Sequence, residues 1–160
     1  MPSSVDTSRE DPLVGFHFAL DVQGVIKGYF TEVSGIGSES EVAEQKVVSE
    51  KGIQVVLKVP GRLKWGDITL KRGLTSSMDL WKWRKLVEDG DVKGARKNGS
   101  ITMFDQSLKA VAQWDFKNAW PSKITGPAPK SDSNELQVEE IVLVHEYITR
   151  KSYDRLEHNS

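Results

Sequence analysis

A change in hydrophobic period within residues 65–90 constrains the fold of this chain more than any other feature. Ile68 and Leu70 alternate with polar neighbours, which is the two-residue period of a half-buried strand. After Gly73 the apolar residues recur at helical spacing, at Leu80, Trp83, Leu86 and Val87. Gly90 then supplies a helix stop. Because a short amphipathic helix cannot bury its apolar stripe alone, we expect it to cover a sheet.

The helix is predicted over about residues 77–89. Thr75, Ser76 and Ser77 offer N-cap side chains, and Asp79 follows Ser76 by three residues, as in a capping box. At about 100° per residue, Trp81 points away from the apolar stripe. Its ring therefore lies either half covered along the sheet margin or beneath another polypeptide, since tryptophan is enriched at interfaces.

Length and composition limit the possible functions. The 160 residues include 22 basic and 23 acidic side chains and no cysteine, and they are expected to form a single domain. The lack of cysteine excludes disulfides, thiolate catalysis and cysteine zinc sites. A net charge of −1 gives no overall attraction to nucleic acid or to an anionic membrane. We expect neither a signal peptide nor a membrane span, because no apolar run has the required length.

Alternating apolar residues predict antiparallel strands along most of the chain. Residues 16–22 and 25–33 form a predicted hairpin around Gln23-Gly24, and residues 39–48 form a further strand with few large apolar side chains. Residues 91–97 are a predicted polar connection, and Asn98-Gly99 is a turn signal. Three later strands are expected at residues 101–104, at 110–118 ending before Trp120-Pro121, and at 134–148. The last has apolar residues on both faces, so both faces should be covered.

Residues 49–64 combine strong strand propensity with turn signals at both ends. Ile53, Val55, Leu57 and Val59 alternate along the segment, between Glu50-Lys51-Gly52 and Pro60-Gly61. We expect a projecting hairpin or loop arm. A projecting apolar strand is an aggregation hazard in a monomer, but it is safe when a neighbouring chain pairs with it.

These elements predict a mainly β fold of about seven or eight antiparallel strands with one helix, arranged as a barrel or as two packed sheets. Residues 1–10 are expected to be a mobile arm, residues 11–149 the domain, and residues 150–160 a polar tail.

No arrangement of residues indicates catalysis, a cofactor or a metal site. His145-Glu146 lacks a metal-binding spacing, and His17 is expected to face away from the apolar side of its strand. Gly35-Ile36-Gly37 precedes a strand rather than a helix, so it does not form a dinucleotide loop. Lys93, Arg96 and Lys97 form a small basic cluster without aromatic residues, which favours a solvated loop over a nucleic-acid site.

The order and spacing of several short motifs resemble the tail tube proteins of contractile phages and contractile injection systems. The motifs are Asp11-Pro12, Glu32-Val33-Ser34-Gly35, Val59-Pro60-Gly61, Ile68-Thr69-Leu70-Lys71-Arg72-Gly73-Leu74-Thr75, Leu80-Trp81, Asn118-Ala119-Trp120-Pro121, Gly126-Pro127 and His145-Glu146. They span nearly the whole chain. The resemblance implies two packed antiparallel sheets forming a β-barrel-like subunit with a projecting arm.

The resemblance also implies a function without chemistry. Such subunits assemble as hexameric rings that stack into a hollow tube inside a contractile sheath. The expected partners are further copies of the chain, the sheath protein, baseplate and cap proteins, and luminal cargo, either protein or DNA. Assembly is expected in the cytoplasm, into a phage tail or an injection particle, and the resemblance leaves open whether such a particle is released from the cell or anchored to it.

From the arm and the helix we predict a subunit interface that contains Ile53, Val55, Leu57, Val59 and Trp81. Two alternatives remain open at this point. One is a baseplate paralogue that initiates the tube, and the other is a monomeric β-barrel that binds a small apolar ligand.

Overall fold

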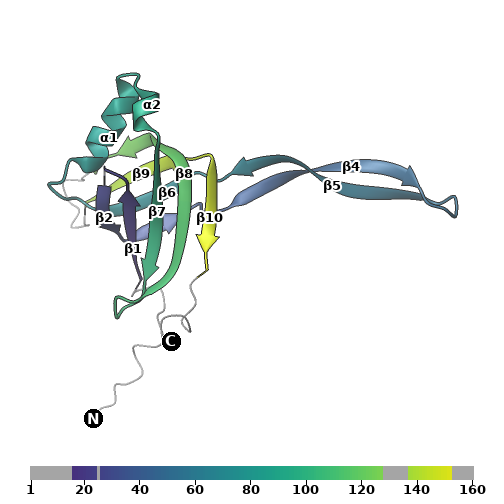
Figure 1. Cartoon of the computed structure of the whole chain (residues 1–160), viewed down its shortest axis with the longest axis horizontal. Helices are drawn as coiled ribbons and strands as arrows, with labels where there is room; N and C mark the ends of the chain where they lie inside the picture. The colour runs from purple at the N-terminus through teal and green to yellow at the C-terminus, as the bar shows by residue number, and fades with distance from the viewer. Residues whose placement is uncertain (1–15, 25, 128–136, 153–160) are drawn as a thin grey trace, which may run out of the picture.

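Ten strands and two helices make up the part of the chain that the computed structural model describes, residues 16–24, 26–127 and 137–152 (Figure 1). The elements in order are β1 His17–Val22, β2 Ile26–Phe30, β3 Glu32–Ser34, β4 Ser38–Val48, β5 Gln54–Trp65, β6 Ile68–Gly73, α1 Asp79–Glu88, α2 Val92–Ala95, β7 Lys97–Phe104, β8 Ala110–Thr125, β9 Val138–Val144 and β10 Tyr147–Lys151. The predicted N-terminal arm at 1–10 and most of the predicted polar tail lie outside the described residues.

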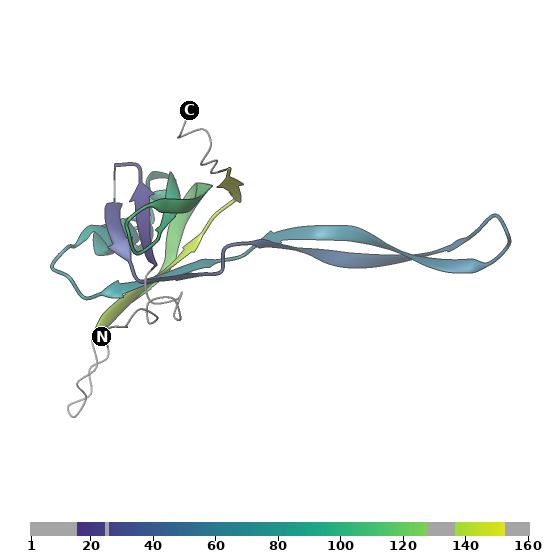
Figure 2. The same ribbon diagram turned by 90° about the horizontal axis from the view of Figure 1, so that it is seen from below.

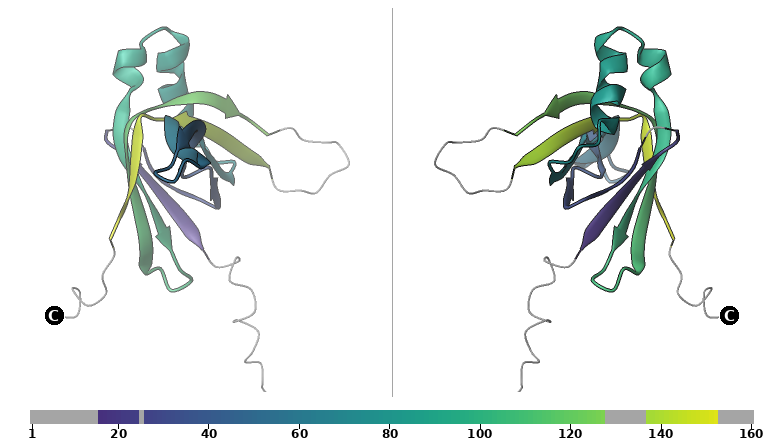
Figure 3. Two further views of the ribbon diagram at one scale, coloured as in Figure 1. Left: turned by 90° about the vertical axis from the view of Figure 1, so that its right-hand side faces the viewer. Right: turned by 90° about the vertical axis from the view of Figure 1, so that its left-hand side faces the viewer.

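Strand β8 joins two antiparallel sheets into one body. The strand order is β2-β1-β7-β8-β9-β6-β3, and β10 also pairs with β8. Along one edge, β8 pairs with β10 through residues 113–117 and with β9 through residues 120–125. Figure 3 shows β8 arching from one sheet to the other beneath the helices. The prediction of a mainly β fold with two packed sheets is confirmed.

The core lies between the inner faces of the two sheets. Ile68 and Leu70 of β6 are fully buried, as their alternation predicted. They pack with buried side chains from both sheets, among them Leu20, Val22, Phe30, Ile101, Phe116, Ile141 and Leu143. Full burial of each such side chain stabilises the fold by about 1.5–3 kcal/mol.

Helix α1 covers one end of this core, close to its predicted position. Leu80 and Trp83 are buried, and the Trp83 indole N–H donates to the Ala95 carbonyl oxygen of α2 at 2.7 Å. The predicted capping box is wrong. The N-cap position is Met78, and no side chain caps the helix there. Helix α2 also occupies the segment predicted as a polar connection.

A buried ion network explains why Asp79 does not take part in a capping box. Arg72 of β6 donates from Nε to Glu139 of β9 and from a terminal nitrogen to Asp79 of α1, both at 2.8 Å. Burial acts to raise the pKa of Asp79, but hydrogen bonds from Arg72 and from the Leu80 amide lower it overall. The network therefore fastens the start of α1 to two strands of one sheet.

Several of the predicted strand ends and turns are wrong. The strand predicted at 25–33 is interrupted at Thr31, after which β3 pairs with β6 rather than with β1. Asn98-Gly99 is not a turn, because both residues lie in β7. The strand predicted at 134–148 divides at His145-Glu146 into β9 and β10.

Strand β8 continues beyond Trp120-Pro121, where the sequence predicted its end. Asn118 has a φ of 53°, and the pairing with β9 shifts register between Pro121 and Lys123. Proline lacks an N–H group, so it fits a strand at an irregularity of this kind. The bend at these residues lets one strand serve both sheets.

We predict that Arg72→Ala lowers the free energy of unfolding by about 3–5 kcal/mol, because it leaves Glu139 buried without its cation. Lys71→Ala is the matched control. Lys71 is the adjacent residue, and its half-exposed ion pairs with Glu32 and Glu140 span 3.8 and 3.7 Å. Its loss should cost less than about 1 kcal/mol. Urea unfolding followed by tryptophan fluorescence measures both, and equal losses would contradict the prediction.

Candidate assembly interface

The arm is a two-stranded ribbon that projects from the body (Figure 2). Strands β4 and β5 pair with each other from Val48 and Gln54 at the tip to Ser38 and Trp65 at the root. The 12 residues of β5 span roughly 40 Å at about 3.3 Å per residue. The predicted projecting hairpin is confirmed, and it also includes the acidic strand that precedes residues 49–64.

A tight turn closes the tip of the arm. The Ser49 amide donates to the Ile53 carbonyl oxygen at 2.8 Å, and the Gly52 amide donates to the Ser49 carbonyl oxygen at 2.9 Å. Gly52 has a φ of 78°, which favours glycine. The turn keeps β4 and β5 in register to their ends.

One face of the arm is more apolar than the other, although Val48 and Val56 are exposed on the opposite face. Val55, Leu57 and Val59 alternate along β5, so their side chains share a face, and their cross-strand partners are Val47, Gln45 and Ala43. Ile53 precedes Val55 by two residues at the tip. Ile53, Val55 and Leu57 are 58, 37 and 46% exposed, and Val59 is half-buried. Four of the five sequence-predicted interface residues therefore gather along one uncovered surface.

Close backbone packing fixes the root of the arm. A Cβ atom added at Gly35 would lie only 1.9 Å from the Asp67 carbonyl oxygen, and one at Gly66 would lie 2.5 Å from the Gly35 carbonyl oxygen. The Gly66 amide donates to the Gly37 carbonyl oxygen at 2.9 Å. The chain can thus cross itself closely only because these positions lack side chains.

His145 supports this root from the body. Its Nε2 lies 3.0 Å from the Gly66 carbonyl oxygen, which can only accept, so Nε2 carries a proton. Its buried Nδ1 has no hydrogen-bond partner among the described residues. Burial lowers the pKa of His145 overall. The Gly66 and Tyr147 backbone and the charge of Asp67 act in the opposite direction, because they favour the protonated ring. The Trp65 ring packs beside it, with ring centres 6.0 Å apart.

Trp81 lies apart from the arm, at the margin of the body. Its indole N–H donates to Glu139 Oε1 at 3.1 Å, and its ring faces Gly126. The side chain is 36% exposed, as expected for a ring half covered along the sheet margin. The structure does not bring Trp81 together with the arm in one chain, so any shared interface requires a second copy.

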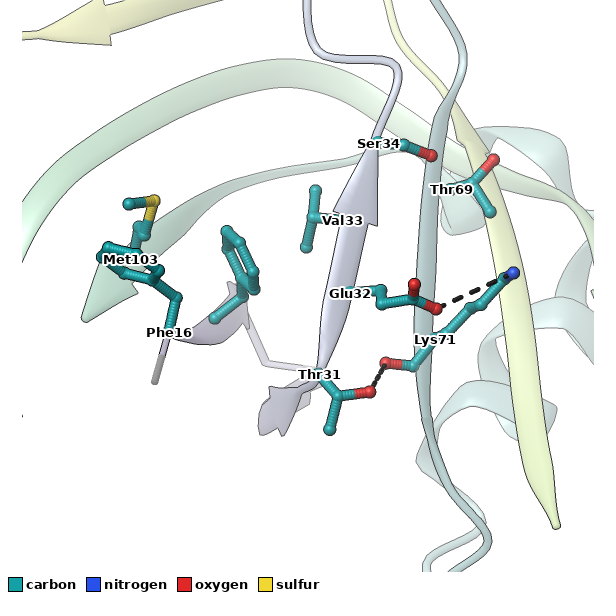
Figure 4. Close-up of a pocket in the computed structure, with 9 residues that line it drawn as sticks. Phe16, Thr31, Glu32, Val33, Ser34, Thr69, Lys71 and Met103 are labelled. Carbon is teal, nitrogen blue, oxygen red and sulfur yellow. Dashed lines mark hydrogen bonds and ion pairs between the residues drawn. The ribbon is translucent and has the colours of Figure 1, made fainter. Parts of the chain in front are cut away.

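A cavity opens at the seam between β1 and β3 (Figure 4). Sequence reasoning missed it, because it depends on how the two sheets meet. Phe16, Phe18, Val33 and Met103 supply apolar walls, and the volume is about 440 Å³. Lys71 lies at its rim, where its amino group is 3.8 Å from Glu32 and its carbonyl oxygen accepts from the Thr31 hydroxyl at 3.3 Å.

The described residues hold no arrangement suited to metal-assisted chemistry. No group of three or more histidine, cysteine, aspartate or glutamate side chains in them is placed to hold a metal ion. His17 is exposed, while Lys93 and Arg96 lie exposed on or next to the short helix α2. Neither helix in these residues is long and apolar enough to cross a membrane.

Comparison with known proteins assigns a family to this β-body with its arm. The family described as T4-like virus tail tube protein gp19 matches residues 14–149. The chain belongs to this family. The match covers both sheets, the helices and the arm, so the chain is a tail tube protein. No curated protein sequence matches it.

Solved structures share the fold of this tail tube protein. A chain of the sheath-tube complex of PVC, an extracellular contractile injection system, is 23% identical, with a TM-score of 0.70 over 96% of this chain and 100% of that chain. A chain of the PVC sheath/tube terminator is 25% identical, with a TM-score of 0.69 over 84% and 93%. Hcp1 from Flavobacterium johnsoniae is 16% identical, with a TM-score of 0.50 over 83% and 93%.

We predict that Gly35→Ala destabilises the tail tube protein by about 1–3 kcal/mol more than Gly24→Ala, because a methyl group at Gly35 would overlap the Asp67 carbonyl. Gly24 is the matched control, since its φ of 71° is also positive but a Cβ there meets no atom within 4 Å. Thermal unfolding of both variants measures the difference. Equal destabilisation would show that only the backbone angle matters.

Stability should fall as pH drops below about 6.5, the ordinary pKa of histidine, because the unfolded chain binds a proton at His145 more readily than the folded one. The pKa of His145 is lowered in the folded protein, so folding favours the neutral ring. Protonation of this ring at low pH therefore favours the unfolded chain. His145→Gln should flatten the slope of unfolding free energy between pH 7.5 and 5.5. His17→Gln, which changes an exposed ring, is the matched control; a slope in His145→Gln equal to that of the wild type would contradict this prediction.

Proposed function

We propose that this tail tube protein is the repeating subunit of the inner tube of a contractile tail or injection system. Copies close into hexameric rings, and the rings stack into a hollow tube that is driven through a target envelope. The observation that carries this proposal is the long arm, which exposes an apolar face that the chain's own body does not cover.

The edges of the sheets support self-assembly. Among the described residues, β2 and β3 end the strand order and β10 pairs with β8 alone, so each has one unpaired edge. An unpaired edge is a template for another strand. Closure of a ring of copies pairs or covers such edges and gives the tube its stiffness.

The subunit interface of the proposal contains Ile53, Val55, Leu57 and Val59 of the arm together with Trp81 of α1. Trp81 is a suitable receiving residue, because its ring is fixed by Glu139 yet remains partly open to a neighbour. The tube domain is assigned to residues 11–149, which the family match over 14–149 supports. Residues 1–10 and 150–160 flank it.

The further partners in the proposal are the sheath, baseplate and cap proteins, with protein or DNA cargo in the bore. The resemblance to chains of the PVC sheath-tube complex and its terminator supports the first group. Assembly takes place in the cytoplasm, and the finished particle acts outside the cell. The subunit performs no catalysis and needs no cofactor or membrane anchor.

Leu57→Asp should abolish tubes in negative-stain micrographs while the monomer stays folded, because it places a charge in the middle of the apolar face. Val56→Asp is the matched control. Val56 is the next residue on the same strand and 50% exposed, but its side chain points to the opposite face. Tube formation by Leu57→Asp at the wild-type level would overturn the proposed interface.

The cavity at the seam favours one alternative, a monomeric barrel that binds a small apolar ligand. Its apolar walls and volume of about 440 Å³ suit such a ligand. Size-exclusion chromatography with light scattering separates the two functions. A ligand carrier elutes near its monomer mass of 17.9 kDa, whereas a tube subunit forms rings or longer assemblies.

A further inference from the structure

The last side chain of the arm packs against two rings of the body. Trp65, the final residue of β5, lies beside His145 with ring centres 6.0 Å apart, and it meets Tyr147 edge to face at 5.4 Å. His145 and Tyr147 stand where β9 ends and β10 begins. Trp65 is the only aromatic residue in the sequence of the two arm strands. This cluster of three rings, together with the backbone crossing at Gly35, joins the arm to the body.

Gly66, the residue after Trp65, is held from both sides. Its amide donates to the Gly37 carbonyl oxygen at 2.9 Å, and its carbonyl oxygen accepts from His145 Nε2 at 3.0 Å. The first bond joins the two connections of the arm to each other, whereas the second joins them to the body. Glycine adopts a wide range of backbone angles, so the Gly66 peptide would turn readily without these bonds. His145 is the side chain by which the body holds this peptide in place.

The surroundings of His145 favour a neutral ring. Nε2 carries the donated proton, and Nδ1 is buried without a hydrogen-bond partner among the described residues. A second proton would place a buried N–H at Nδ1 with nothing to accept it, which is unfavourable. The charged ring reaches water only by turning, and turning takes Nε2 away from the Gly66 carbonyl oxygen.

Burial outweighs the groups that favour a charged ring. Burial lowers the pKa of His145, whereas the Gly66 and Tyr147 backbone and the charge of Asp67 raise it by smaller amounts. Asp67 belongs to the root of the arm itself. A ring that turns toward this carboxylate would therefore also leave its place beside Trp65.

Three further charges lie on the elements around this ring. Lys117 of β8 lies over the Tyr147 ring, 5.9 Å from its centre, so the charge that it adds to the cluster is positive. The Glu146 carboxylate accepts from the Asn118 side chain. Lys64 of β5 precedes Trp65, so its side chain points to the other face of the strand. None of the three pairs with Nδ1.

We propose that the neutral His145 ring holds the arm in its observed direction and that protonation of this ring in acid releases the arm at its root. The body keeps its fold, because its buried core does not include His145. The released arm is attached through its two backbone connections, where Gly35, Gly37 and Gly66 allow hinge motion.

Spin labels test this directly, since the chain has no cysteine of its own. Glu50→Cys places one label at the arm tip and Lys93→Cys places a second on α2, both at exposed positions. All chains carry Leu57→Asp, which is expected to keep copies apart, and the fraction of monomer mass is measured. Double electron–electron resonance should give a narrow distribution of tip-to-body distances at about pH 7.5. At about pH 5, well below the ordinary histidine pKa, the distribution should be about twofold wider or more.

Variants of His145 separate the proton from the hydrogen bond. His145→Gln keeps an N–H that can donate to Gly66 but gains no proton in this range, so its distribution should stay narrow at both pH values. His145→Ala removes the donor, so its distribution should be wide at both. His17→Gln changes an exposed histidine of β1 and is the matched control, which should widen in acid as the starting chain does.

Three results would overturn the inference. They are a narrow distribution of the starting chain in acid, an equal widening of His145→Gln in acid, and a narrow distribution of His145→Ala. Near-ultraviolet circular dichroism at about pH 5 reports whether the body keeps its tertiary packing. Loss of that signal along with the widening would also overturn the inference, because the release would then not be confined to the arm.

Release of the arm has a consequence that rests on the proposed function. An arm without a fixed direction must be ordered on binding, so the assembled fraction of the native chain should fall by about tenfold or more between about pH 7.5 and about pH 5. His145→Gln should assemble to within about twofold at both pH values. Equal assembly of the native chain at both would overturn this consequence. A native chain that forms neither rings nor tubes at either pH would instead overturn the proposed function and leave the spin-label result standing.

Discussion

The arm depends on the backbone contact at its root. A two-stranded ribbon has no core of its own and is marginally stable in isolation. Its direction is set where Gly35 crosses Asp67 and where the Gly66 amide donates to Gly37. His145 holds the same crossing through the Gly66 carbonyl. So few residues can hold a long arm in one direction only if they adopt a single backbone arrangement. The close packing at the glycines favours one such arrangement.

The body holds the root of the arm in a fixed position. Strand β8 carries the connection between the two sheets, so both sheets keep one orientation around the core. The network of Arg72, Glu139 and Asp79 then ties α1 to β6. Strand β6 begins at Ile68, directly after Asp67 at the root of the arm. Trp81 joins this network through Glu139. The proposed receiving residue and the root of the arm are thus connected through β6 within one rigid unit.

Local periodicity predicted the elements whose residues follow a single rule. The alternation at Ile68 and Leu70, the helical stripe from Leu80 and the projecting hairpin all appear where expected. The predictions fail where a contact between residues far apart in the sequence determines the local structure. Asp79 binds Arg72 instead of forming a capping box, and the last predicted strand divides at His145-Glu146, where His145 lies against the Gly66 carbonyl oxygen. A sequence window that sees only neighbours within a few residues cannot detect such contacts.

The proposed interface was predictable in part for the same reason. Alternation places Ile53, Val55, Leu57 and Val59 on one face of the arm, so their grouping follows from the period alone. The seam cavity around Phe18 and Val33 does not, because its walls come from strands far apart in the sequence. Within the described residues β4 and β5 pair with each other alone, which the period of either strand does not reveal.

The apolar face of the arm and the contacts at its root perform different tasks in an assembly. Burial of Val55 and Leu57 supplies association energy without direction, and it would favour any apolar partner, including a symmetric dimer. The backbone contact at the root, where Gly35 lies against Asp67, instead fixes the direction in which that face is presented. A closed ring requires each copy to bind the previous one in the same relative orientation. An arm that presents its apolar face in one fixed direction therefore lets copies add in a constant orientation, which the apolar contact alone would not ensure.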